Sequence, residues 1–123
     1  PLSRGELLAL RGIGEETADS ILLYAFSRPS FVVDAYTRRV LSRLGLVGGN
    51  EPYALVQDLF QRALPAQPDL FAEYHALLVA HAKARCRARP LCAGCPVRRC
   101  PSRETGPIGA AASRPRRGRA GKD

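Results

Sequence analysis

Hydrophobic residues recur every three or four positions along most of the chain, which is the spacing expected on one face of a helix. No segment shows the alternation of apolar and polar residues that is typical of a half-buried strand. We therefore predict an all-α fold. Helices are expected over residues 3–10, 15–27, 34–44, 50–64 and 69–85, with glycine- or proline-containing breaks between them.

Local signals predict where these helices begin and end. Ser3 and Glu6 fit a capping box at the start of the first helix. Arg28 precedes a proline, is therefore biased away from helical geometry, and should end the second. Gly45 should stop the third helix, and Asn50 is a candidate cap for the fourth.

The chain has 123 residues, which is enough for one domain with a modest core or for part of a larger one. No apolar run approaches the roughly 20 residues of a membrane span, so we expect no membrane association. The N-terminus has neither a signal-peptide pattern nor an initiator methionine, and we expect the chain to be part of a longer protein.

Positive charge is concentrated toward the C-terminus. Residues 1–80 contain seven arginines against nine acidic residues, whereas residues 81–100 contain six basic residues and no acidic one. Such a basic segment beside a nearly neutral core is typical of a polyanion-binding protein, although a solvated basic surface explains the charge equally well. Residues 101–123 are rich in Arg, Gly, Pro and Ala and are predicted to form a disordered basic tail.

The stretch LRGIGEETA places two glycines around one isoleucine just before a helix. Gly12 and Gly14 allow a sharp turn and leave backbone N–H groups uncovered at the helix N-terminus, where an anion is favoured. Ile13 is expected to point back and pin the two helices together. A nucleic-acid phosphate would suit this turn, but a plain turn between helices is an alternative, and the charges of Glu15 and Glu16 oppose a bound phosphate.

The chain has four cysteines, and they lie within fifteen residues in the spacing C-x5-C-x2-C-x4-C. They are Cys86, Cys92, Cys95 and Cys100. Disulfides are not expected without a secretory signal, so the cysteines predict a metal site. Structural zinc usually takes two cysteine pairs from separate turns. An inner C-x2-C flanked by single cysteines instead suits a 4Fe–4S cluster, with zinc as the alternative.

The motif LRGIGEETA, the aspartate in FVVDAYTRR and a C-terminal four-cysteine loop occur in this order, and together they resemble the endonuclease III superfamily of DNA glycosylases, the HhH-GPD proteins. These motifs look most like those of the endonuclease III-related branch. The resemblance covers about residues 3–100 and only the C-terminal portion of a full-length member. It implies a helix–hairpin–helix glycosylase fold with DNA bound across a cleft. In that fold, residues 1–85 would belong to the helical region and residues 86–100 would form the iron–sulfur loop.

The resemblance also assigns roles to single residues. It implies that Gly12, Ile13 and Gly14 form the DNA-binding hairpin and that Asp34 is the catalytic aspartate. Asp34 is also placed to cap the helix that begins at Ala35, and the two roles are compatible. The four cysteines take the cluster-ligand positions, with each outer gap one residue shorter than is usual in the family.

Glu16 stands where bifunctional members carry a lysine that attacks C1′ of the sugar and forms a Schiff base. A carboxylate cannot form an imine, so the resemblance implies a base-excision-repair glycosylase that hydrolyses the N-glycosidic bond without strand cleavage. Glu16 is then a candidate pocket residue. A bifunctional glycosylase and lyase, or a non-catalytic DNA-binding module, are the alternatives. His75 and His81, on the longest predicted helix, are interpreted as core or surface histidines.

The expected partner is double-stranded DNA that contains a damaged or mismatched base. We expect a monomer that acts in the bacterial cytoplasm in association with the nucleoid.

Overall fold

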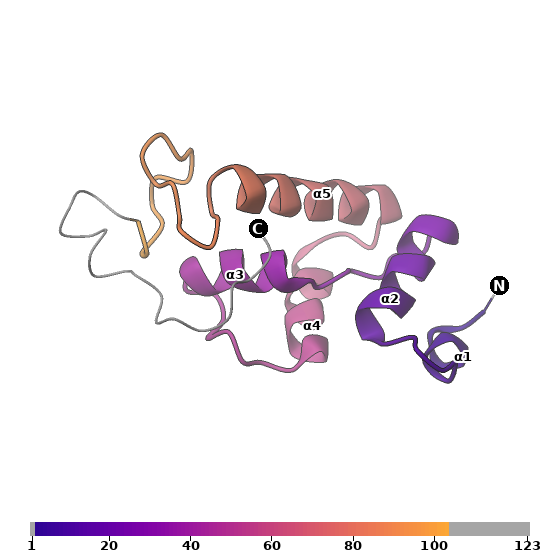
Figure 1. The fold of residues 1–123 in the computed structure, drawn as a ribbon. Helices are drawn as coiled ribbons and strands as arrows, with labels where there is room; N and C mark the ends of the chain where they lie inside the picture. The colour runs from indigo at the N-terminus through magenta and orange to yellow at the C-terminus, as the bar shows by residue number, and fades with distance from the viewer. Residues whose placement is uncertain (1, 104–123) are drawn as a thin grey trace.

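The structure is a computed structural model that describes residues 2–103, and within this range it consists of helices and loops with no strand, as predicted (Figure 1). The helices are α1 (Arg4–Leu8), α2 (Glu15–Ser20), the π-helix η1 (Ile21–Ala25), α3 (Ala35–Arg43), α4 (Tyr53–Ala63) and α5 (Pro68–Ala84). Among the described residues, no helix is long and apolar enough to cross a membrane. The predicted tail lies outside the described residues from position 104 onward.

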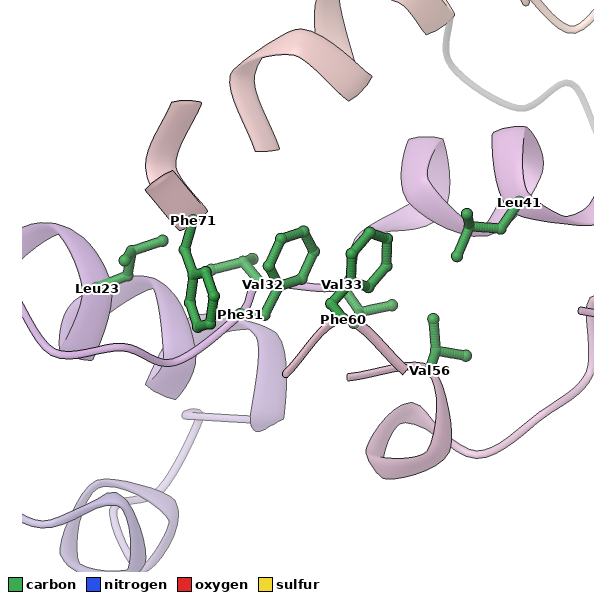
Figure 2. Close-up of a cluster of buried hydrophobic side chains, with 8 residues drawn as sticks. All are labelled: Leu23, Phe31, Val32, Val33, Leu41, Val56, Phe60 and Phe71. Atoms are coloured by element: carbon green, nitrogen blue, oxygen red, sulfur yellow. The ribbon is translucent and has the colours of Figure 1, made fainter. Parts of the chain in front are cut away.

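An extended segment, residues 31–33, runs through the larger of the two hydrophobic clusters (Figure 2). Phe31 stacks on Phe60 of α4 with ring centroids 3.9 Å apart, and Phe71 of α5 meets Phe31 edge-on at 5.5 Å. The side chains of Phe31, Val32 and Val33 are almost completely buried. Each large apolar side chain buried in this way stabilises the fold by about 1.5–3 kcal/mol relative to exposure. The core is completed by Leu23, Leu41 and Val56.

A smaller cluster joins α1 to α2. Leu7, Ala18 and Leu22 form its buried centre, and Ile13 packs against it from the intervening turn. The prediction that Ile13 pins the two helices together is therefore confirmed.

The second predicted helix is shorter and less regular than expected. The α-helical pattern ends at Ser20 and is followed by a π turn, in which the N–H of Phe26 donates to the carbonyl of Ile21 at 3.2 Å. The helix ends at Ala25, before the predicted boundary at residue 27, because Ser27 adopts a left-handed φ of 50°. Such π turns frequently occur at functional sites.

Two capping predictions are confirmed and one is wrong. The capping box of Ser3 and Glu6 is present, and Gly45 has the left-handed φ of 77° that ends α3. Asn50 does not cap α4, which begins at Tyr53 after Pro52. The loop before α4 is instead closed by the carboxylate of Glu51.

The carboxylate of Glu51 accepts hydrogen bonds from the N–H groups of Gly48 and Gly49 at 2.6 and 2.9 Å. These backbone donors stabilise the charged form and lower the pKa of Glu51. Because this turn uses residues 48–51, the first helical residue is displaced to Tyr53.

A buried carboxylate connects α1, α2, the loop before α3, and α4. Asp19 is fully buried and accepts from Arg4 at 2.9 and 3.1 Å in a bidentate pair, and also from the hydroxyl of Ser30. The hydroxyl of Tyr53 is hydrogen-bonded to Asp19 and accepts from the N–H of Val33 at 3.3 Å. Burial and the neighbouring negative charge raise the pKa of Tyr53, so its hydroxyl remains a donor.

We expect Asp19→Ala to lower the free energy of unfolding by about 3 kcal/mol, because it leaves Arg4, Ser30 and Tyr53 without their shared acceptor. Urea unfolding measures the change. Asp58→Ala is the control, since Asp58 pairs with Arg62 on the surface of α4 at 2.7 Å and should contribute about 0.5 kcal/mol. Equal losses in the two variants would contradict a structural role for Asp19.

Candidate functional site

Asp34 lies at the junction between the buried segment 31–33 and α3. It is the N-cap of α3, and its Oδ1 accepts from both the N–H and the hydroxyl of Thr37, at 2.8 and 2.9 Å. The cap interpretation is therefore confirmed. Only one carboxylate oxygen is used for capping, and the Asp34 side chain is 14% exposed. The second oxygen, Oδ2, takes no part in the cap.

The backbone of residues 31–33 is held by side chains, because an extended buried segment must satisfy its polar groups without a neighbouring strand. Gln57 of α4 donates to the carbonyl of Phe31 at 2.9 Å, and Gln61 accepts from the N–H of Phe31 at 2.9 Å. Tyr53 accepts from the N–H of Val33. These contacts fix the approach of the chain to Asp34.

His75 of α5 lies beside the second oxygen of Asp34. Its Nδ1 is 3.2 Å from the carbonyl oxygen of Val32, and its Nε2 is 3.6 Å from Oδ2 of Asp34. The imidazole also meets the ring of Tyr24 edge-on, with centroids 6.3 Å apart. Burial, and secondarily the negative charge of Asp34, raise the pKa of Tyr24.

Sequence analysis did not place His75 or Tyr24 at the site. A signal for His75 was present, because it continues the helical spacing of Phe71, Leu78 and Ala82 and so belongs to the inward face of α5. That spacing alone does not distinguish a core histidine from one that faces a carboxylate.

The glycine turn lies at the other end of the α2–η1 helix. Gly12 has a left-handed φ of 84°, which glycine tolerates, and Gly14 is the N-cap of α2. A Cβ added at Gly14 would meet no heavy atom within 4 Å, so packing does not explain this glycine. The surface at Gly14 is open to a close backbone approach by a ligand.

Glu16 is exposed in the first turn of α2. Within residues 2–103, no hydrogen bond or ion pair joins Glu16 or the glycine turn to Asp34. Ten residues separate Gly14 from Tyr24, which corresponds to about 15 Å along the helix at 1.5 Å per residue. Gly14 and Tyr24 therefore lie at opposite ends of the α2–η1 helix.

All four cysteines line one cavity between the end of α5, α3 and the loop that follows α5. The cavity encloses about 450 Å³ of space, part of which is open to solvent, and its apolar lining comes from Val40, Leu44, Leu91 and Val97. The cysteines are free thiols and half-buried. In Figure 1 this loop is drawn in orange beyond the end of α5.

Arginine side chains hold this loop in place. Arg43 donates to Sγ of Cys86 at 3.4 Å, and Arg39 donates to the Cys86 carbonyl at 2.9 Å. Together Arg43, Arg85 and Arg103 donate to the carbonyls of residues 87, 88, 93, 95 and 97. Part of the predicted basic segment is therefore directed inward, while Arg87, Arg89, Arg98 and Arg99 are exposed.

The sulfur arrangement bears on the kind of metal. Among the described residues, no three His, Cys, Asp or Glu side chains lie close enough to hold a single metal ion. Structural zinc requires all four ligands around one ion, with Zn–S bonds of about 2.3 Å. An iron–sulfur cluster binds each thiolate through a different iron and so accepts ligands spread around a larger cavity. Four cysteines that line one cavity are consistent with a 4Fe–4S cluster.

Known proteins resemble this chain in sequence. A candidate DNA repair glycosylase of Methanocaldococcus jannaschii is 50% identical over 95 residues, which is 77% of this chain and 43% of that protein. Endonuclease III of Sulfolobus acidocaldarius is 38% identical over 96 residues, covering 77% and 42%. Endonuclease III of Bacillus subtilis is 32% identical over 98 residues, covering 79% and 44%. No family model matches the chain.

A solved structure also resembles the fold. It is a non-covalent endonuclease III–DNA complex, with a TM-score of 0.69 and 29% sequence identity over 78% of this chain and 44% of that one. The chain therefore spans less than half the length of the relatives it matches.

Proposed function

Because the chain belongs to the endonuclease III-like family of DNA repair glycosylases, we propose that it carries the catalytic aspartate, the phosphate-binding turn and the cluster loop of a monofunctional glycosylase. The observation that carries this proposal is that the two carboxylate oxygens of Asp34 have different contacts. One oxygen is fixed by the α3 cap, and the other lies 3.6 Å from Nε2 of His75. The carboxylate is thereby oriented before any substrate arrives.

The reaction is hydrolysis of the bond between a base and its sugar. The target nucleotide is turned out of the duplex, which is easiest for a damaged or mismatched base. As the C1′–N bond breaks, its electron pair leaves with the base and positive charge develops on the sugar. Asp34 stabilises that charge, and the oxygen of a water molecule forms the new bond to C1′.

The proposal excludes a Schiff base because no amine is available at the family's lysine position, where this chain has Glu16. The chain has two lysines, Lys83 and Lys122. Lys83 of α5 stands over the ring of Tyr36, with Nζ 5.7 Å from the ring centroid, and Lys122 lies outside the described residues.

The turn from Gly12 to Gly14 is proposed to bind a DNA phosphate through the backbone N–H groups of its two glycines, independently of base sequence, because the Ile13 N–H already donates to the Leu10 carbonyl at 3.3 Å. The open surface at Gly14 supports this role, because a phosphate can approach the backbone there without meeting a side chain. The exposed arginines of the cysteine loop would add further phosphate contacts.

Cys86, Cys92, Cys95 and Cys100 are proposed to hold a 4Fe–4S cluster, which when bound supplies a redox-active group and four covalent links across the loop. The protein's own part is the scaffold: Arg43 donates to the Cys86 sulfur, and arginine side chains donate to the loop carbonyls. Because the loop has no regular secondary structure, these bonds give it a defined shape.

A non-catalytic DNA-binding module is the second candidate. It is favoured by the open surface at Gly14 and the exposed arginines of the cysteine loop, which suit phosphate contacts without any chemistry.

We expect Asp34→Asn to reduce base excision by a factor of about 100 or more, because the developing positive charge loses its counter-charge. Asparagine caps helices as well as aspartate does, so stability should be preserved. The measurement is single-turnover excision by the protein as encoded in full, on duplexes bearing uracil, alkylated purines or oxidised pyrimidines.

Gly14→Ala is the matched variant for this test. It should weaken DNA binding, measured by fluorescence anisotropy, whereas Asp34→Asn should leave binding intact. Excision by Asp34→Asn at the wild-type rate would refute the catalytic role. DNA binding by the wild type without excision of any of these lesions would instead support the non-catalytic module.

Borohydride reduction should trap no covalent complex between the wild-type protein and damaged duplex DNA, because Glu16 cannot form an imine. Glu16→Lys restores an amine at the family position and is expected to yield a trapped adduct, which denaturing electrophoresis detects. A trapped adduct with the wild type would show that the enzyme is bifunctional.

Protein purified without oxygen should be brown and contain iron and acid-labile sulfide in equal amounts. Cys92→Ala is expected to lose both the colour and the iron. Ser102→Ala is the control, because Ser102 also lines the cavity but offers no thiolate. A colourless protein with stoichiometric zinc would contradict the cluster.

A further inference from the structure

We propose that His75 acts together with Asp34 as the second acceptor for the attacking water and takes the proton that this water releases. The inference rests on the proposed glycosylase function and adds a residue to its site. It follows from the position of His75 between the Val32 carbonyl and the free oxygen of Asp34.

The carbonyl of Val32 determines which imidazole nitrogen carries the proton. A carbonyl oxygen only accepts hydrogen bonds, so Nδ1 at 3.2 Å must be the donor. In the neutral ring, Nε2 then has no proton and presents a lone pair. The peptide of Val32 lies in the buried segment that α4 side chains hold on both sides, so this orientation is fixed.

Two acceptors therefore stand side by side. Nε2 of His75 and Oδ2 of Asp34 are 3.6 Å apart, which is too long for a direct hydrogen bond and leaves the neutral pair without a shared proton. A water molecule has two O–H groups and satisfies both acceptors at once. The side chains of His75 and Asp34 are 15% and 14% exposed, so both are only partly accessible to solvent.

The titratable groups that face the imidazole are Asp34, from the N-cap of α3, and Tyr24, from η1. Tyr24 stays uncharged because burial and the charge of Asp34 raise its pKa. The tyrosine ring packs edge-on against the imidazole and restricts its rotation. The charge that His75 meets is thus that of Asp34.

The proton and electron balance is complete with these groups. The water oxygen bonds to C1′, the C1′–N bond breaks, and its electron pair leaves on the base. One water proton passes to Nε2, which gives an imidazolium next to the Asp34 carboxylate. Solvent then protonates the base anion and removes the proton from His75.

The arrangement predicts the direction of the pH dependence. When His75 is protonated before substrate binds, Nε2 donates to Oδ2 of Asp34, and both water acceptors are lost. Excision should therefore fall as the pH decreases and His75 becomes protonated.

The test compares His75→Gln with the wild type in the protein as encoded in full. Glutamine keeps an N–H donor for the Val32 carbonyl but cannot take a proton. We expect excision to fall by a factor of about 100 and its acid-side decrease to disappear, while DNA binding is unchanged. Glu73→Gln, on the exposed face of α5, is the isosteric control. An unchanged rate and pH profile in His75→Gln would overturn the inference.

NMR of the imidazole nitrogens provides a readout that does not depend on activity. We expect the Nδ1–H tautomer in neutral His75, and a change in the Nε2 signal in Asp34→Asn. Finding the Nε2–H tautomer would overturn the inference. If Asp34→Asn abolishes excision and His75→Gln does not, the inference fails and the proposed function stands. If the wild type excises no lesion, the proposed function fails and this inference fails with it, and the NMR signals show only whether His75 and Asp34 interact.

Discussion

The constraint on which the rest of the structure depends is the burial of an extended segment, residues 31–33, without a strand beside it. Apolar side chains drive the segment into the core, but its peptide groups must still be satisfied there. Gln57, Gln61, Tyr53 and His75 supply the partners, and they come from α4 and α5. The hydrogen bonds that satisfy the buried peptide groups therefore also fix the backbone immediately before Asp34.

A second buried interaction extends this constraint toward the N-terminus. Asp19 binds Arg4 of α1 and the hydroxyl of Tyr53, and Tyr53 also accepts from the Val33 N–H. One hydroxyl thus belongs both to the network that holds α1 against α2 and to the one that holds the segment before Asp34. A buried carboxylate is unfavourable unless it is paired. Asp19 therefore needs Arg4, Ser30 and Tyr53 beside it at the same time. This links the helices on either side of the glycine turn to the region of Asp34.

The helix pattern, the capping box and the cap role of Asp34 could be predicted because they depend on residues three or four positions apart. The start of α4 could not, because it depends on Glu51 folding back onto two preceding N–H groups. The cysteine spacing predicted a metal site, but not the arginine contacts from α3, since Arg43 and Cys86 are distant in sequence. His75 was missed for the same reason: its significance lies in contacts with Val32 and Asp34 across the fold.

The division of the Asp34 carboxylate has a consequence for how binding and chemistry are related. Capping fixes Oδ1, so the orientation of Oδ2 is set by α3 and needs no contact with DNA. The glycine turn lies at the opposite end of α2–η1 from Tyr24, about 15 Å away along the helix. Under the proposed function, the glycine turn would meet an anionic phosphate, and the Asp34 carboxylate would face a developing cation. The α2–η1 helix connects the glycine turn to Tyr24, and its π turn determines where Tyr24 meets His75.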